Sequence, residues 1–106
     1  MAAMREIHEL VGQIAREFRP ERIILFGSHA YGTPGADSDV DLLVVVTDDG
    51  NPLRKAMEIR RRIPATFPLD VVVRDPQDLR WRIEQHDWFL KEIVEKGKVL
   101  HAAADG

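Results

Sequence analysis

The sequence predicts a small α/β (α+β) domain in which helices pack against one short sheet. Three observations predict this fold class. Apolar residues recur at helical spacing near the N-terminus, short β-branched apolar runs follow, and proline or glycine separates one pattern from the next. The resulting order is helix, strand, short helix, strand, helix, strand, helix. Because the 106 residues contain no internal repeat, we expect one domain over residues 1–106, with a core that folds without disulfides.

The first half of the chain alternates helix and strand patterns. Apolar residues at steps of three and four form one stripe that ends before Pro20, which is typical of an amphipathic helix. Two later apolar runs are typical of strands, and the second, apolar on both faces, should lie centrally in the sheet. The expected elements are a helix over 4–18, a strand over 22–26, one helical turn beginning at Ser28 in a loop over 28–35, and a strand over 39–46.

The second half contains two helix starts of the same kind. Asparagine or aspartate followed by proline, at Asn51-Pro52 and Asp75-Pro76, combines a capping side chain with a residue suited to the first helical position. The expected elements are a helix from 52 to 63, a strand over 69–73, a helical segment from 76 that breaks near 86 and ends at Gly97, a short edge strand over 98–101 and a frayed tail over 102–106.

Composition excludes several classes of protein. Fifteen Lys and Arg against 18 Asp and Glu give a net charge of -3, which argues against direct nucleic-acid binding through bulk positive charge. The absence of cysteine excludes disulfides and thiol chemistry and fits a reducing, cytoplasmic location. The longest apolar run, Leu42 to Val46, is far shorter than the roughly 20 residues of a membrane-spanning helix, and the N-terminus lacks signal-peptide order.

Three aspartates are candidate metal ligands. Side chains alternate along a strand, so Asp39 and Asp41 point to one face with Cα atoms about 6.5 Å apart. Asp70 interrupts an otherwise apolar strand, where an isolated charge is unfavourable without a partner. If the two strands are neighbours, the three carboxylates surround one or two Mg²⁺ ions, an arrangement suited to phosphoryl or nucleotidyl transfer.

The turn after the first strand provides a complementary phosphate site. Gly27 allows the backbone to approach a ligand closely, and Ser28 offers N–H groups and a hydroxyl to phosphate oxygens. Ser38 is placed to cap or orient the acidic strand. Either feature alone is typical of an ordinary turn, but together they indicate a site for a nucleoside triphosphate such as ATP with its metal.

The spacing of these residues resembles a known signature. Gly27-Ser28, a ten-residue spacer and Asp39-Val40-Asp41 are similar to the motif of the DNA polymerase β-like nucleotidyltransferases, and the chain resembles their minimal members, the MNT antitoxins paired with HEPN-domain toxins. The resemblance implies a nucleotidyltransferase fold with a mixed sheet flanked by helices. It also implies that Asp39, Asp41 and Asp70 bind Mg²⁺ and act in catalysis.

The same resemblance implies a reaction. Gly27, Ser28 and Ser38 would bind the nucleotide, and Asp70 would help to deprotonate a hydroxyl that attacks the α-phosphorus and releases pyrophosphate. AMP from ATP would pass to a hydroxyl of a HEPN partner, which makes the chain an antitoxin. Because 106 residues leave no room for an acceptor-binding domain, we expect the acceptor to carry its own recognition surface.

An alternative function stays open. Many relatives have arginine where this chain has Tyr31, and a non-catalytic antitoxin that neutralises its partner by occlusion would retain the site only for nucleotide binding. The sequence also leaves open the nucleotide, the acceptor and a homo-oligomeric state.

Other prominent side chains are expected to have structural roles. We expect Trp81 and Trp88 to pack in the core rather than to form a partner surface. His29 is expected on a surface loop, with a phosphate contact as the alternative. A solvated helix face, with an acceptor-binding patch as the alternative, is expected for the cations Arg54, Lys55, Arg60, Arg61 and Arg62.

Overall fold

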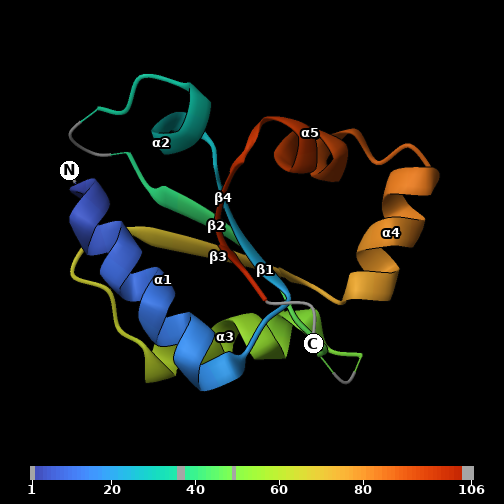
Figure 1. Cartoon of the computed structure of the whole chain (residues 1–106), viewed down its shortest axis with the longest axis horizontal. Coiled ribbons are helices and arrows are strands. Elements are labelled where there is room, and N and C mark those ends of the chain that lie inside the picture. Colours follow the sequence, from blue (N-terminus) through green and yellow to red (C-terminus); the bar gives the residue numbers. More distant parts are fainter. Residues whose placement is uncertain (1, 36–37, 49, 104–106) are drawn as a thin grey trace.

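The computed structural model describes residues 2–35, 38–48 and 50–103 and folds them around one four-stranded sheet (Figure 1). The helices and strands are α1 (Met4–Phe18), β1 (Arg22–Phe26), α2 (Ser28–Tyr31), β2 (Val40–Val45), α3 (Pro52–Arg62), β3 (Leu69–Arg74), α4 (Pro76–Glu84), α5 (Trp88–Lys96) and β4 (Lys98–Ala102). Each element expected from the sequence is present, and its bounds either agree with the expected ones or differ from them by one or two residues.

The sheet is mixed, as the predicted fold class requires. Its strands lie in the order β3-β2-β1-β4, with β1 antiparallel to both β2 and β4, and β2 parallel to β3. A parallel pair needs a long crossover, and α3 provides it between β2 and β3. The central position predicted for the second strand is confirmed, because β2 has neighbours on both sides and is buried from Leu42 onward.

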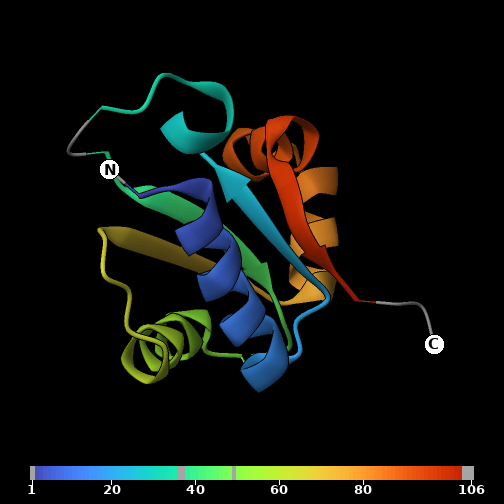
Figure 2. The same ribbon diagram turned by 60° about the vertical axis from the view of Figure 1, so that its left-hand side comes forward.

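Each face of the sheet is covered by a different pair of helices (Figure 2). Alternate residues along a strand face opposite sides, so β2 contributes Leu42 and Val44 to one cluster and Leu43 and Val45 to the other. The first cluster lies beneath α1 and α3, and the second lies beneath α4 and α5. Burial on both faces explains the continuous apolar run of β2.

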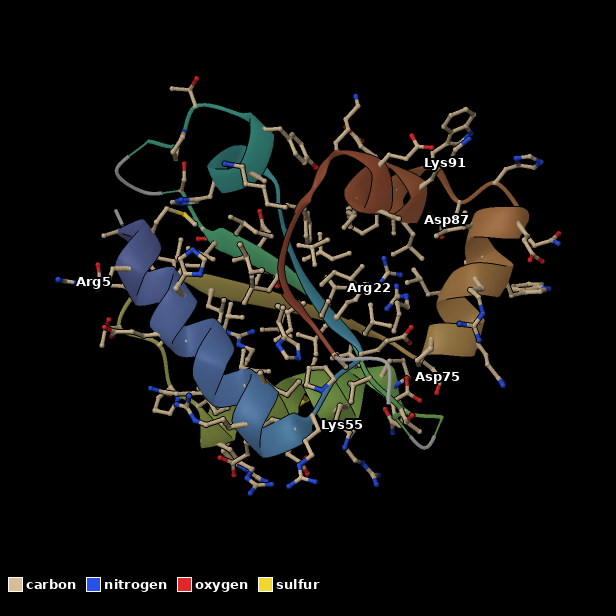
Figure 3. The ribbon with its side chains drawn as sticks, in the orientation of Figure 1. Arg5, Arg22, Lys55, Asp75, Asp87 and Lys91 are labelled. Atoms are coloured by element: carbon tan, nitrogen blue, oxygen red, sulfur yellow. The ribbon has the colours of Figure 1, made fainter. Side chains whose placement is uncertain are left out.

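Side-chain caps start the helices where the sequence predicts. Asn51 Oδ1 accepts from the N–H of Arg54 at 3.0 Å, and Asp75 Oδ1 accepts from that of Gln77 at 2.9 Å, each with proline at the next position. Asp87 Oδ1 accepts from the N–H of Leu90 at 3.1 Å and begins α5. Asp75 and Asp87 therefore mark the starts of α4 and α5 (Figure 3).

Two expectations are wrong. Trp81 and Trp88 do not pack in the core: they lie on separate helices with 57% and 76% of their surfaces exposed, because α4 and α5 bury Leu79, Leu90 and Ile93 instead. The predicted tail does not begin at residue 102. Ala102 belongs to β4, and the N–H of the next residue donates to the carbonyl of Glu21 at 2.8 Å. Residues 104–106 of that tail lie outside the described residues.

Among the described helices, none combines the length and the apolar character needed to cross a membrane.

Candidate active site

Two of the predicted metal ligands are direct partners in the sheet. In the parallel pair of β2 and β3, Asp41 is in register with Asp70. Partner residues in a sheet point to the same face, with strands about 4.8 Å apart. Asp39 lies one residue before β2 and two before Asp41. The two strands that carry Asp41 and Asp70 are therefore neighbours, as the predicted three-carboxylate site requires. All three aspartates lie at the same edge of the sheet, where β2 and β3 begin.

Asp41 and Asp70 lie on the face covered by α4 and α5, at the end where β1 stops and β2 and β3 begin. Asp41 alternates with Val40 and Leu42, which belong to the cluster beneath α1 and α3, so its side chain faces the opposite side. Asp41 is half-buried, whereas Asp39 and Asp70 are exposed. Solvent, a cation or a substrate can therefore reach this acidic edge.

The surroundings of Asp41 change the pKa of its carboxyl. Burial raises the pKa of the Asp41 carboxyl above its ordinary value, and the negative charges of Asp70 and Asp39 raise it further, while His29 acts in the opposite direction. The group thus carries its charge at a cost when no cation is bound. A divalent cation between these carboxylates would remove the repulsion.

Gly27 is required by the position of Asp41. Its φ of 75° and ψ of -156° are accessible almost only to glycine. A Cβ built on Gly27 would collide with Oδ2 of Asp41 and lie 3.2 Å from its Cγ. The preceding residue, Phe26, is the register partner of Asp41 across β1 and β2. Glycine therefore lets the carboxylate of Asp41 lie directly against the backbone from which α2 begins.

The short helix α2 begins directly after Gly27, beside the carboxylate of Asp41. Within the turn, Ala30 and Tyr31 donate to the carbonyl of Gly27 at 3.0 and 3.1 Å, and Gly32 donates to that of Ser28 at 3.1 Å. The N–H groups of the first helical residues, Ser28 and His29, precede these donors and have no partner within the turn. The hydroxyl of Ser28, which is half-buried, stands beside them.

Ser38 has an observed role in the loop that joins α2 to β2. Its Oγ accepts from the N–H of Gly35 at 2.8 Å, and its carbonyl oxygen lies 3.4 Å from Nε2 of His29. These contacts hold the chain just before the acidic strand, in line with the orienting role expected of Ser38. A contact between Ser38 and a nucleotide stays a prediction.

The chemistry of the donor set fits Mg²⁺, which prefers carboxylate oxygens. The carboxylate of Asp41 lies directly against Gly27, and the charges of Asp70 and Asp39 act on its pKa, so the three acidic groups are close enough to interact. Among residues 2–35, 38–48 and 50–103, no three His, Cys, Asp or Glu side chains are gathered into a ready-made ligand cluster. Three like charges lower their energy by turning apart when no cation lies between them. Coordination by Asp39, Asp41 and Asp70 together therefore stays a prediction.

A charge-removing substitution tests this electrostatic coupling. Replacing Asp70 with asparagine is expected to lower the pKa of Asp41, because one of the negative charges that raise it is lost. The carbon-13 chemical shift of the Asp41 carboxyl, followed through a pH titration in the absence of divalent cations, measures the change. Asp48→Asn is the control for removal of a negative charge elsewhere, since Asp48 follows the opposite end of β2. An unchanged titration in Asp70→Asn would contradict the coupling.

One aromatic pair beside the acids was not anticipated from the sequence. The ring of Phe89, in the first turn of α5, meets the ring of Phe26 edge to face with centroids 5.7 Å apart. Because Phe26 is in register with Asp41, this contact brings α5 next to the carboxylates. Phe89 stands next to Trp88 in a segment that resembles any amphipathic helix, so no local pattern distinguishes it.

A separate cavity of about 600 Å³ lies along α3, which packs on the other face of the sheet. Its lining residues are Asn51, Leu53, Arg54, Met57, Glu58 and Arg61. It is therefore not part of the acidic edge.

Comparison with known proteins identifies the family and the fold. The family model described as "Nucleotidyltransferase domain" matches residues 7–101. A crystal structure of a toxin-antitoxin with AMP-PNP has the same fold, with a TM-score of 0.56, 24% identity, and coverage of 91% of this chain and 73% of that chain. A crystal structure of a mutant of the toxin-antitoxin MntA-HpeT, with two aspartate-to-glutamate changes two positions apart, also has this fold. Its TM-score is 0.55 and its sequence identity is 19%, and the match covers 91% of this chain and 73% of that chain. No curated protein matches the chain.

Proposed function

Because the chain belongs to the nucleotidyltransferase domain family, we propose that it is a Mg²⁺-dependent enzyme that transfers AMP from ATP to a hydroxyl of a partner protein. The observation that carries the proposal is the parallel register that pairs Asp41 with Asp70 beside the Gly27-Ser28 turn. A cation site and a phosphate site at one edge of a sheet are the two parts that a nucleoside triphosphate requires.

Each residue of the site has a distinct part in this reaction. Asp39, Asp41 and Asp70 hold the Mg²⁺, which when bound offsets negative charge on the phosphate oxygens. The N–H groups at the start of α2 and the hydroxyl of Ser28 bind the triphosphate, and Gly27 leaves room for it. Asp70, on edge strand β3 and exposed, accepts the proton of the acceptor hydroxyl. The hydroxyl oxygen then bonds to the α-phosphorus as the bond to pyrophosphate breaks.

The partner we propose is a HEPN-domain toxin, with this chain as its antitoxin. Both similar crystal structures are of toxin-antitoxin proteins, one of them with AMP-PNP. In the mutant among them the two changed aspartates are two positions apart, as Asp39 and Asp41 are in this chain. The first likeness supports a toxin partner that could carry the acceptor hydroxyl, and the second supports a role for Asp39 and Asp41.

A second candidate function is supported by the surface. Large apolar side chains are exposed away from the acidic edge, among them Leu53 at 71% and Met57 at 64% on α3. Exposed apolar groups of this kind are typical of interaction surfaces. An antitoxin that neutralises its partner by occlusion, without transfer, would use such a surface and would not need the carboxylates.

Labelling experiments test the transferase function. Incubating the protein with ATP labelled at the α-phosphate, Mg²⁺ and the co-encoded partner is expected to transfer the label to the partner, since the acceptor hydroxyl attacks the α-phosphorus. ATP labelled at the γ-phosphate is the control and should leave the partner unlabelled, because that phosphate departs in pyrophosphate. Chelation of Mg²⁺ should stop the transfer.

The outcome separates the two candidates. Label on the partner that persists after both Asp39 and Asp41 become asparagine would contradict the transferase site. If the same double variant still neutralises the partner in cells, occlusion is sufficient and catalysis is not the neutralising event. If it binds the partner but no longer neutralises it, occlusion is rejected.

A further inference from the structure

The ring of Phe89 is a half-exposed apolar surface next to the catalytic edge. Its exposed fraction is 52%, although the ring rests on Phe26, which is almost fully buried at 7%. Phe26 faces the same side of the sheet as its register partner Asp41, and such cross-strand partners have Cβ atoms about 4.5–5.5 Å apart. Phe89 therefore contacts the residue that pairs directly with Asp41.

The helix α5 lies against the end of β1 that pairs with Asp41. Leu90 and Ile93 share a buried cluster with Leu43 and Val45 of β2, so the helix lies over β2 as well as β1. At its far end Gly97 packs so closely on β1 that a Cβ there would lie 2.9 Å from the carbonyl oxygen of Leu25. Figures 1 and 2 both show α5 side by side with α2, the helix that begins at Ser28.

The neighbouring aromatic residues differ from Phe89. Trp88 is exposed at 76% and its ring lies beneath Nζ of Lys91, 5.4 Å from the ring centroid. Trp81 lies on α4 and is exposed at 57%. Among the described residues, Phe89 is the aromatic side chain that combines exposure with a ring contact to a residue in register with Asp41.

Resting on the transferase function proposed above, we propose that Phe89 forms the nucleobase subsite of the active site and that the preferred substrates are purine nucleoside triphosphates. A nucleobase is a flat aromatic ligand that covers an apolar ring by stacking. With the phosphates at Ser28 and the carboxylates, the base of the same nucleotide would extend toward α5, whose Phe89 contacts the register partner of Asp41. A purine, with two fused rings, covers more of the Phe89 ring than a pyrimidine.

Equilibrium binding of three magnesium complexes by calorimetry tests this subsite. The complexes are those of ATP, CTP and inorganic tripolyphosphate, which keeps the phosphates and lacks the base. Phe89→Leu retains an apolar contact with Phe26 and removes the aromatic face. It is expected to weaken ATP binding roughly tenfold, to weaken CTP binding less, and to leave tripolyphosphate binding unchanged. Phe89→Tyr should restore ATP binding, and Trp88→Leu, the matched control, should bind ATP as the wild type does.

Three results would overturn the subsite. Phe89→Leu that binds ATP as tightly as the wild type excludes stacking on this ring. An equal loss of tripolyphosphate and ATP binding in Phe89→Leu indicates a structural role for the residue. Wild-type protein that binds neither ligand contradicts the proposed transferase function itself, and the subsite with it.

Discussion

Replacing Asp41 with asparagine is expected to lower nucleotidyl transfer by roughly a thousandfold, because the variant loses the carboxylate that lies against Gly27 and with it a proposed ligand for the metal. The same change is expected to make the metal-free protein more stable at neutral pH. Transfer is measured by release of pyrophosphate, and stability by thermal unfolding in the presence of a chelator. Lower activity with higher stability separates loss of chemistry from loss of folding.

The sign of the stability change follows from proton binding. The folded protein raises the pKa of Asp41 above 3.8, so it retains a proton at pH values where the unfolded chain has lost it. Stability contributed by this group is therefore present at low pH and falls as pH rises from near 3.8 through the folded pKa. Asparagine carries no charge and avoids the fall. Partial exposure of Asp41 screens the effect, so a gain of only a few degrees in Tm is expected.

Two results would contradict this prediction. Asp41→Asn that melts below the wild type in chelator would show that the carboxylate stabilises the fold, and undiminished transfer would show that it is not a metal ligand. Excess Mg²⁺ with ATP should raise the Tm of the wild type more than that of the variant, since a ligand stabilises only the state that binds it.

Gly27→Ala is expected to reduce both stability and activity. The added Cβ collides with Oδ2 of Asp41, and alanine is strained at a φ of 75° combined with a ψ of -156°. Together these effects should lower the free energy of unfolding by about 2–4 kcal/mol. They should also push the carboxylate of Asp41 out of place, so transfer is expected to fall even at temperatures where the variant remains folded.

Gly50→Ala is the matched control. Gly50 also has a positive φ, 83°, but a Cβ there meets no described atom within 4 Å. That variant should lose about 1 kcal/mol from backbone strain alone and keep its activity. Denaturant unfolding and pyrophosphate release measure both changes. Equal losses in the two variants would show that strain, and not the contact with Asp41, explains the need for glycine at position 27.

Local patterns in the sequence predicted most of the elements. Helical spacing that ends before Pro20 predicted α1. The pairs Asn51-Pro52 and Asp75-Pro76 predicted the starts of α3 and α4, because an N-cap side chain and a proline at the first helical position act within one turn. The same local rules failed for Trp81 and Trp88. An apolar side chain on a helix is buried only if another element covers that face, and the sequence does not state which faces are covered.

The sequence predicted which residues form the candidate site, but it did not show how they are arranged in space. Glycine, serine and three aspartates are recognisable by residue type and spacing, which is why the resemblance to nucleotidyltransferases could be drawn and is confirmed. Phe89 carried no such signal, because its significance depends on a contact with a strand more than sixty residues earlier in the chain.

The sequence by itself determined where nearly every helix and strand begins, and it predicted which side chains would hold a cation and where a phosphate would approach the backbone. Only the tertiary structure decided that Asp41 pairs with Asp70, that its carboxylate lies against Gly27, and that α5 brings Phe89 to the same edge. Helix starts and strand patterns arise from interactions among residues close in the chain. Register between β2 and β3 depends on how a crossover helix packs, which involves residues distant in sequence.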